Sequence, residues 1–255
     1  MLLLAIDTST PTVTAGVVSL LRPHELVAGN GSSVPVPAPM PDPVRLLAER
    51  SVTDPFAHAE KLMPLVRAAL IEAGHGLADA EAIVVGLGPG PFTGLRVGIA
   101  TAQALGDALD IPVHGVGSHD AAARAELAGQ ADAATGDLLV VTDARRHEVY
   151  LSAYSSTGAR RFGPAPVAPA DVSARLAEHE VTPGRMTGPG AVLLAGQPGL
   201  RHVPVSPTSS GLAVGLVLVA ARALLTSVLP GPLSPLYLRR PDAAEPRAPK
   251  SVLGS

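Results

Sequence analysis

One pattern of residues occurs twice in the chain, near its start and again past its midpoint. In each copy a β-rich run ends in an aspartate, a few residues turn, and a second β-rich run follows. The runs are residues 2–6 and 12–21 in the first copy, and 138–142 and 147–154 in the second. Such a duplication is typical of two related lobes that face a cleft. We therefore predict an α/β fold with duplicated mixed sheets flanked by helices.

The rest of the chain supplies further elements and the lobe boundaries. Strands are expected at 44–52 and 82–86, and helices at 54–73, 93–109, 170–179 and 209–228. Asp54 and Pro55 resemble an N-cap followed by proline at the first helical position, and Gly74 resembles a C-cap. Residues 23–43 are dense in Pro, Gly and Ser and predict a loop.

These elements predict three parts. The first lobe is expected over residues 1–110, completed by the C-terminal segment 209–240. A second, smaller lobe is expected over 111–208, and a disordered tail over 241–255.

Composition limits the core and the partners. Hydrophobic residues make up 47% of the chain but aromatic residues only 2%, so the core must be built from Ala, Val, Leu and Ile. The chain has no cysteine, which excludes disulfides and thiolate chemistry. Net charge is −3 and lysine occurs only at Lys61 and Lys250, so we expect no broad basic surface for nucleic acid. If RNA is involved, we expect another chain to hold it.

Neither a signal peptide nor a membrane span is expected. The apolar start has no basic segment before it, and Asp7 interrupts it. The uncharged run 211–221 is about half the length that a span needs and fits a buried helix better.

A glycine- and proline-rich turn, residues 88–98, follows the strand expected at 82–86 and opens into a helix with Thr93 as the expected cap. Its glycines could bring amides against a phosphate, but no P-loop lysine or third dinucleotide-type glycine follows. The absence of these residues therefore favours a structural or partner-facing turn. Gly94, Gly98 and Ala102 recur at steps of four, which lets another helix approach closely, from the same domain or from a partner.

The two turn aspartates are the candidate cofactor ligands. In two-lobed nucleotide-binding folds, carboxylates at the positions of Asp7 and Asp143 commonly place Mg²⁺ through water beside phosphates. Alternatively, each aspartate accepts hydrogen bonds from its own turn amides. Neither turn contains a glycine that would let amides reach a phosphate, so the residues favour the second interpretation.

Three other groups of residues are candidate sites, and none of them is favoured. His58 would need a second histidine at position 62 to form a metal pair on one helix face, and position 62 is leucine. Ser118, His119 and Asp120 are adjacent, so their side chains should point apart rather than form a relay. The charged cluster at residues 145–148 is interpreted as a solvated turn, with partner or nucleotide binding as the minority alternative.

Several motifs, in order along the chain, resemble the TsaB family, also called YeaZ. They are residues 4–10, 58–64, 88–98, 143–145 with 148–150, and 235–239. The resemblance implies a two-lobed actin-like fold, shared with sugar kinases and chaperone ATPases. It also implies a cytosolic bacterial protein required for threonylcarbamoylation of adenosine 37 in tRNA. The chain departs from the family pattern in its longer insertion at 23–43 and in Pro91, where serine is usual.

The resemblance further implies a non-catalytic subunit that docks on and activates a catalytic paralogue, TsaD, through a bundle of two helices from each chain. Here those helices match residues 58–73 and 93–109. The expected contact residues are His58, Leu62, Val66, Ala69, Arg96, Gly98 and Ala102. The apolar stripe on the first of these helices is wide enough to serve both core and interface.

Further partners follow from the same resemblance. A TsaE-like ATPase, a second copy of the chain in isolation, and tRNA through the complex are the expected partners. We expect no cofactor on this chain alone, with ATP and Mg²⁺ at the interface left open. Asp7, Thr8 and Asp143 are the candidate cofactor contacts. Two alternatives remain: an ATP-binding small-molecule kinase or ATPase that uses Asp7 and Asp143, and a self-associating scaffold.

Overall fold

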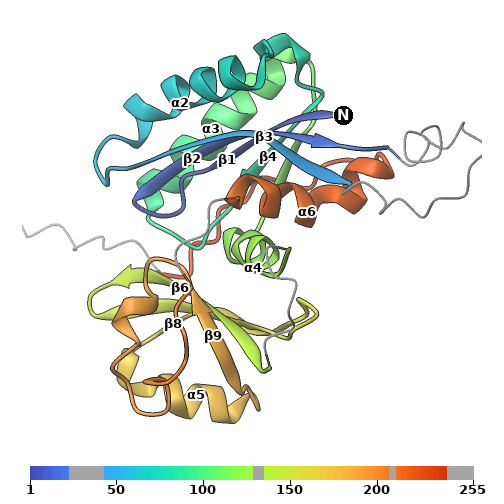
Figure 1. The fold of residues 1–255 in the computed structure, drawn as a ribbon. Coiled ribbons are helices and arrows are strands. Elements are labelled where there is room, and N and C mark those ends of the chain that lie inside the picture. The colour runs from blue at the N-terminus through green and yellow to red at the C-terminus, as the bar shows by residue number, and fades with distance from the viewer. Residues whose placement is uncertain (23–42, 129–134, 207–210, 240–255) are drawn as a thin grey trace, which may run out of the picture.

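The computed structural model describes residues 1–22, 43–128, 135–206 and 211–239, and Figure 1 shows their arrangement. The chain forms two mixed sheets. The first has the order β3-β2-β1-β4-β5 and the second the order β8-β7-β6-β9. The strands of the first sheet are β1 (Leu2–Asp7), β2 (Thr12–Leu20), β3 (Val44–Thr53), β4 (Ala82–Gly86) and β5 (Val113–Val116). Those of the second are β6 (Asp137–Arg145), β7 (Glu148–Tyr154), β8 (Arg160–Val167) and β9 (Pro183–Thr187).

The predicted duplication is confirmed strand by strand. β1 is antiparallel to β2 and parallel to β4, and β6 is likewise antiparallel to β7 and parallel to β9. Asp7 pairs with Thr14 and Asp143 with Val149, at the same end of the central strand in each sheet. The boundary at residue 110 needs correction, because β5 pairs with β4 and the first sheet therefore reaches Val116.

Helices cover the sheets in layers. α2 (His58–Ala73) and α3 (Phe92–Leu109) pack on one face of the first sheet, and α6 (Leu212–Leu225) packs on the other. α4 (Ser118–Ala128) lies between α6 and the second sheet, whose far face is covered by α5 (Val172–Glu178) (Figure 1). The cores are aliphatic, as the composition predicts.

α4 and α6 join the two lobes where they cross. A Cβ atom built on Gly215 of α6 would lie 2.0 Å from the carbonyl oxygen of Ala121 on α4, so only glycine permits this approach. Ala121 belongs to the core shared with α6 and the first sheet, whereas Ala123 packs with Leu138 and Tyr154 of the second sheet. One helix therefore contributes to both hydrophobic cores.

Two predicted helix starts are wrong. α2 begins at His58 with Ala57 in the cap position, whereas the Asp54 carboxylate accepts a hydrogen bond from the Phe56 amide at 3.0 Å in the turn before it. α3 begins at Phe92 directly after Pro91, so Thr93 lies inside the helix and cannot cap it. The predicted end of α2 at Gly74 is confirmed by its left-handed conformation.

Two predicted segments lie outside the described residues: the insertion at 23–43, apart from its last residue, and the whole tail at 241–255. Within the described part of the chain, no helix has both the length and the apolar character needed to cross a bilayer.

Candidate functional site

Asp7 is fully buried at the end of β1 and holds three segments together. One carboxylate oxygen accepts hydrogen bonds from the Ser9 amide at 2.8 Å and the Ser9 hydroxyl at 2.6 Å. The other accepts from the Ser118 hydroxyl at 2.6 Å, and Ser118 Oγ in turn accepts from the Gly88 amide. Burial raises the pKa of Asp7, and these hydrogen bonds oppose that rise. Both oxygens are engaged and shielded from solvent, so they do not fit a water-bridged Mg²⁺ site.

Thr8 is buried against the small face of α3. Its hydroxyl donates to the carbonyl oxygen of Gly94 at 2.7 Å, and a Cβ atom on Gly98 would lie 2.2 Å from Thr8 Oγ1. The glycine stripe of α3 therefore packs on the β1–β2 turn of its own lobe. Of the two neighbours predicted for the stripe, the same domain or a partner chain, the structure shows the same domain.

The expected contact residues also need correction, because six of the seven are buried inside the first lobe. Five of them lie in the core of the first lobe: Leu62, Val66, Ala69, Gly98 and Ala102. His58 is also buried, with Nε2 hydrogen-bonded to the Thr10 carbonyl at 2.9 Å. Arg96 alone of the seven is exposed. The reason is that the apolar and small sides of both helices face the sheet.

A different face of α2 and α3 is exposed. On α2 it includes Pro64, Arg67, Ala68 and Ile71, and on α3 it includes Ala100, Gln103 and Ala104. The Ile71 side chain is 78% exposed, and no element within the described residues packs over it. Helical periodicity separates this face from the opposite one, but the sequence did not show which of the two points inward.

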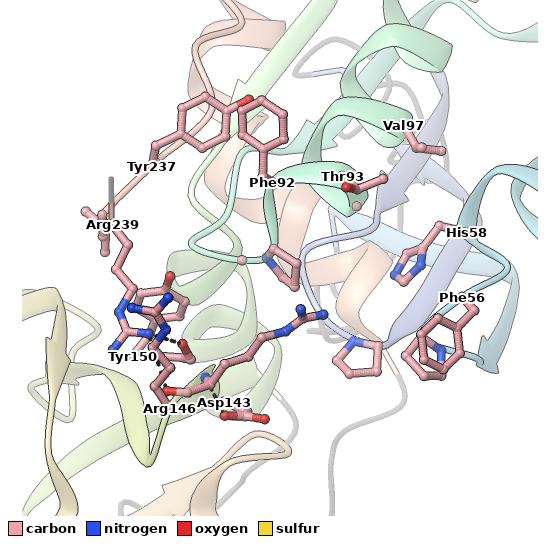
Figure 2. Close-up of a pocket in the computed structure, with 18 of the residues that line it drawn as sticks. Phe56, His58, Phe92, Thr93, Val97, Asp143, Arg146, Tyr150, Tyr237 and Arg239 are labelled. Carbon is pink, nitrogen blue, oxygen red and sulfur yellow. Dashed lines mark hydrogen bonds between the residues drawn. The ribbon is translucent and has the colours of Figure 1, made fainter. Parts of the chain in front are cut away.

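A pocket of about 520 Å³ opens between the lobes, where α2 and α3 begin and the β6–β7 turn faces them (Figure 2). Asp143 lines this pocket, and its carboxylate accepts a hydrogen bond from the Arg145 amide at 2.7 Å. Asp7 and Thr8 do not line it. The structure therefore does not bring the three predicted cofactor contacts together.

The C-terminal segment 236–239 forms one wall of the pocket and connects the lobes. The Leu236 amide donates to the Leu87 carbonyl in the first lobe. The Tyr237 ring stacks on Phe92 with 4.9 Å between centroids, and the Arg96 guanidinium lies 3.9 Å from the Phe92 centroid. Arg239 donates to the Ala144 carbonyl at 3.0 Å and pairs with Glu148 in the second lobe.

The β6–β7 turn carries cationic side chains to the opposite wall. Arg145, Arg146 and His147 all have positive φ, at 61°, 53° and 61°. Three consecutive non-glycine residues in this region carry backbone strain. The sequence predicted a solvated turn at these positions, and the exposure of all three residues confirms it. The structure adds that Arg145 and Arg146 line the open pocket.

A second cleft, of about 590 Å³, has a lining rich in hydroxyl side chains that also includes His119 and Glu49. The His119 ring is hydrogen-bonded to Ser152 Oγ at 2.8 Å and Thr142 Oγ1 at 2.9 Å, both in the second sheet. Burial, with a smaller contribution from Arg160, lowers the pKa of His119 to about 3.

The side chains of Ser118, His119 and Asp120 diverge, as predicted. Ser118 donates to Asp7, His119 faces the second sheet, and Asp120 accepts from Tyr154. Among the residues that the structure describes, no three histidine or acidic side chains are close enough together to hold a metal ion.

Comparisons with known proteins agree with this architecture. The family model described as TsaD, tRNA N6-adenosine threonylcarbamoyltransferase, matches residues 55–186. An uncharacterized protein of Mycobacterium tuberculosis is 46% identical over 94% of this chain and 92% of its own length. The tRNA threonylcarbamoyladenosine biosynthesis protein TsaB of Escherichia coli is 37% identical over 39% of this chain and 42% of its own.

The fold has a solved counterpart. YeaZ from Pseudomonas aeruginosa superimposes with a TM-score of 0.65 at 27% identity, covering 93% of this chain and 99% of that one. The predicted fold class, a two-lobed actin-like fold with duplicated sheets, is confirmed by this similarity together with the strand order.

Proposed function

The chain belongs to the TsaB (YeaZ) family, and from that membership we propose that it is a non-catalytic subunit required to form N6-threonylcarbamoyladenosine in tRNA. In this proposal it docks on a TsaD-type paralogue, which carries out the transfer, and activates it. The relatives named for this pathway support the role in tRNA modification.

The exposed face of α2 and α3 is the observation that carries the docking proposal. Ile71 is 78% exposed, and its neighbours on this face include Pro64, Ala68, Ala100 and Ala104. Small apolar side chains present little to desolvate and let a partner helix approach closely, which favours a helix-to-helix interface. A large apolar side chain in water is also unfavourable, and a partner that covered Ile71 would remove that cost.

Charge placed on this face should prevent docking without unfolding the chain. We predict that Ile71→Arg and Ala104→Arg each weaken binding of the TsaD-type paralogue by at least about tenfold, because each buries an unpaired cation. Binding is measured by co-elution and by calorimetric titration with the paralogue from the same organism. Circular dichroism confirms that both variants are folded.

Ala174→Arg is the matched control, since Ala174 is an exposed alanine on α5 of the other lobe. It should bind the paralogue like the unmodified chain. If the Ile71 and Ala104 variants also bind normally, docking does not use this face.

The remaining partners are proposed on the same basis. A TsaE-like ATPase joins the complex, the chain works in the cytoplasm, and without its paralogue it pairs with itself through the same helices.

ATP with Mg²⁺ would require surfaces shared with the paralogue, because the Asp7 carboxylate and the Thr8 hydroxyl are already hydrogen-bonded and buried. Micromolar binding of ATP and Mg²⁺ by the isolated chain would instead favour a kinase or ATPase.

A further inference from the structure

The pocket between the lobes gathers most of the aromatic side chains of the molecule. The chain has three phenylalanines, three tyrosines and no tryptophan. Four of these side chains line the pocket: Phe56, Phe92, Tyr150 and Tyr237. Phe56, Phe92 and Tyr237 are exposed, whereas Tyr150 is buried. Exposed rings in a pocket are typical of sites that bind flat ligands.

The same pocket is predominantly cationic. Its cationic lining residues are Arg145, Arg146 and Arg239, and Asp143 is the one acidic residue among the lining residues. Arg239 is already paired with Glu148 and hydrogen-bonded to a backbone carbonyl, so it serves mainly to hold the wall in place. Figure 2 shows the Arg146 side chain extending from the β6–β7 turn into the space between the lobes. The pocket therefore favours a ligand that carries negative charge.

The rings differ in what they can still contact. Phe92 and Tyr237 stack on each other, and Arg96 covers Phe92, so these rings form a packed wall. Tyr150 is largely buried in the floor. Phe56 is 95% exposed, held at the opening by the turn in which Asp54 accepts a hydrogen bond from the Phe56 amide. Its ring is therefore open to a stacking partner.

We propose that this pocket binds an unpaired nucleotide of single-stranded RNA, with the base stacked on Phe56 and the adjoining phosphates held by Arg145 and Arg146. Proteins recognise unpaired RNA by stacking bases on aromatic side chains while arginines contact the backbone. The left-handed backbone of the β6–β7 turn presents both arginines on the wall opposite the helix starts. The identity of that RNA as tRNA rests on the proposed function.

RNA binding is measured by fluorescence anisotropy with a labelled seven-nucleotide single-stranded RNA, using the full chain alone and then in complex with the paralogue. The same sequence in a duplex should bind at least about tenfold more weakly, because its bases cannot unstack onto Phe56. Phe56→Ala should weaken binding about tenfold, and this exposed position allows the variant to fold.

Salt dependence separates the roles of the two kinds of side chain. The double variant Arg145→Gln with Arg146→Gln should reduce the slope of log affinity against log salt by about 1.4, since each lost phosphate contact on a single strand contributes about 0.7. Phe56→Ala should leave that slope unchanged. Controls are Leu229→Ala and Arg175→Gln, which replace exposed residues that do not line the pocket.

Several outcomes would overturn the proposal. They are unchanged RNA binding by the pocket variants, an equal loss in the controls, and RNA binding that an acidic peptide abolishes as effectively as unlabelled RNA. Binding of free ATP at micromolar concentration with no affinity for RNA would make the pocket a site for a mononucleotide instead.

Co-elution with the paralogue is measured on the same variants. Loss of docking by Phe56→Ala with RNA affinity retained would make Phe56 an interface residue and overturn the RNA site. Normal docking with reduced RNA affinity supports it. Because Ile71 and Ala104 do not line the pocket, failure of the docking proposal leaves the RNA measurement interpretable.

Discussion

Buried polar side chains join the lobes at the scale of single residues. His119 is contributed by α4, which packs against α6 and the first lobe, yet both of its ring nitrogens are hydrogen-bonded to hydroxyls of the second sheet. Asp7 has the corresponding role in the first lobe, where it connects β1 to Ser118 at the start of α4. Such side chains are buried at a cost that only complete hydrogen bonding offsets.

His119 should make the stability of the protein depend on pH. Its pKa is about 3 in the folded chain and about 6.5 in the unfolded chain, so between these values the unfolded state takes up the proton. The contribution to stability is complete above about pH 6.5 and is lost progressively as pH falls toward 3. The unfolding free energy should fall by about 2 kcal/mol between pH 7 and pH 5 from this residue. Urea titrations at both pH values test this.

His119→Gln is the comparison, since glutamine can hydrogen-bond to both hydroxyls without titrating. Its stability should change less between pH 7 and pH 5 than that of the unmodified chain. An identical loss in both would show that other groups cause the pH dependence.

At the scale of elements, α3 has one face packed inside its lobe and one face exposed to solvent. Gly98→Leu should lower the unfolding free energy by about 1–3 kcal/mol, because the new side chain meets the Thr8 hydroxyl and the β1–β2 turn. Ala100→Leu places the same side chain on the exposed face of the same helix and should change stability by no more than about 0.5 kcal/mol. Chemical denaturation of both variants makes the comparison. Equal losses would mean that the inward face has been assigned incorrectly.

At the scale of the whole molecule, the two lobes should unfold together. α4 contributes Ala121 to one core and Ala123 to the other, and segment 236–239 connects both lobes at the pocket. We therefore predict a single calorimetric transition in which the calorimetric and van't Hoff enthalpies agree. Gly215→Leu, which forces α4 and α6 apart, should lower the transition temperature and separate it into two. Two transitions in the unmodified chain would contradict this prediction.

Local patterns in the sequence determined much of the fold. Strands and helix ends are signalled by residues that are close in sequence. For this reason the strands at 2–6, 12–21 and 44–52 and the C-cap at Gly74 were predictable. The duplicated sheets followed from the repeat itself. The error at Asp54 arose because its carboxylate accepts a hydrogen bond from the Phe56 amide in the turn before the helix. The error at Thr93 arose because the helix begins one residue earlier, directly after Pro91.

Only the tertiary structure decided which surface each residue faces. Periodicity placed Gly94, Gly98 and Ala102 on one side of a helix, but which neighbour lies there depends on Thr8, more than eighty residues earlier. The same holds for the pocket, which Phe56, Arg146 and Tyr237 line from three distant segments of a chain whose net charge gave no sign of a cationic site. The physical reason is that burial and electrostatic potential depend on distances in space. Those distances are set by sheet order and helix packing, which no local pattern encodes.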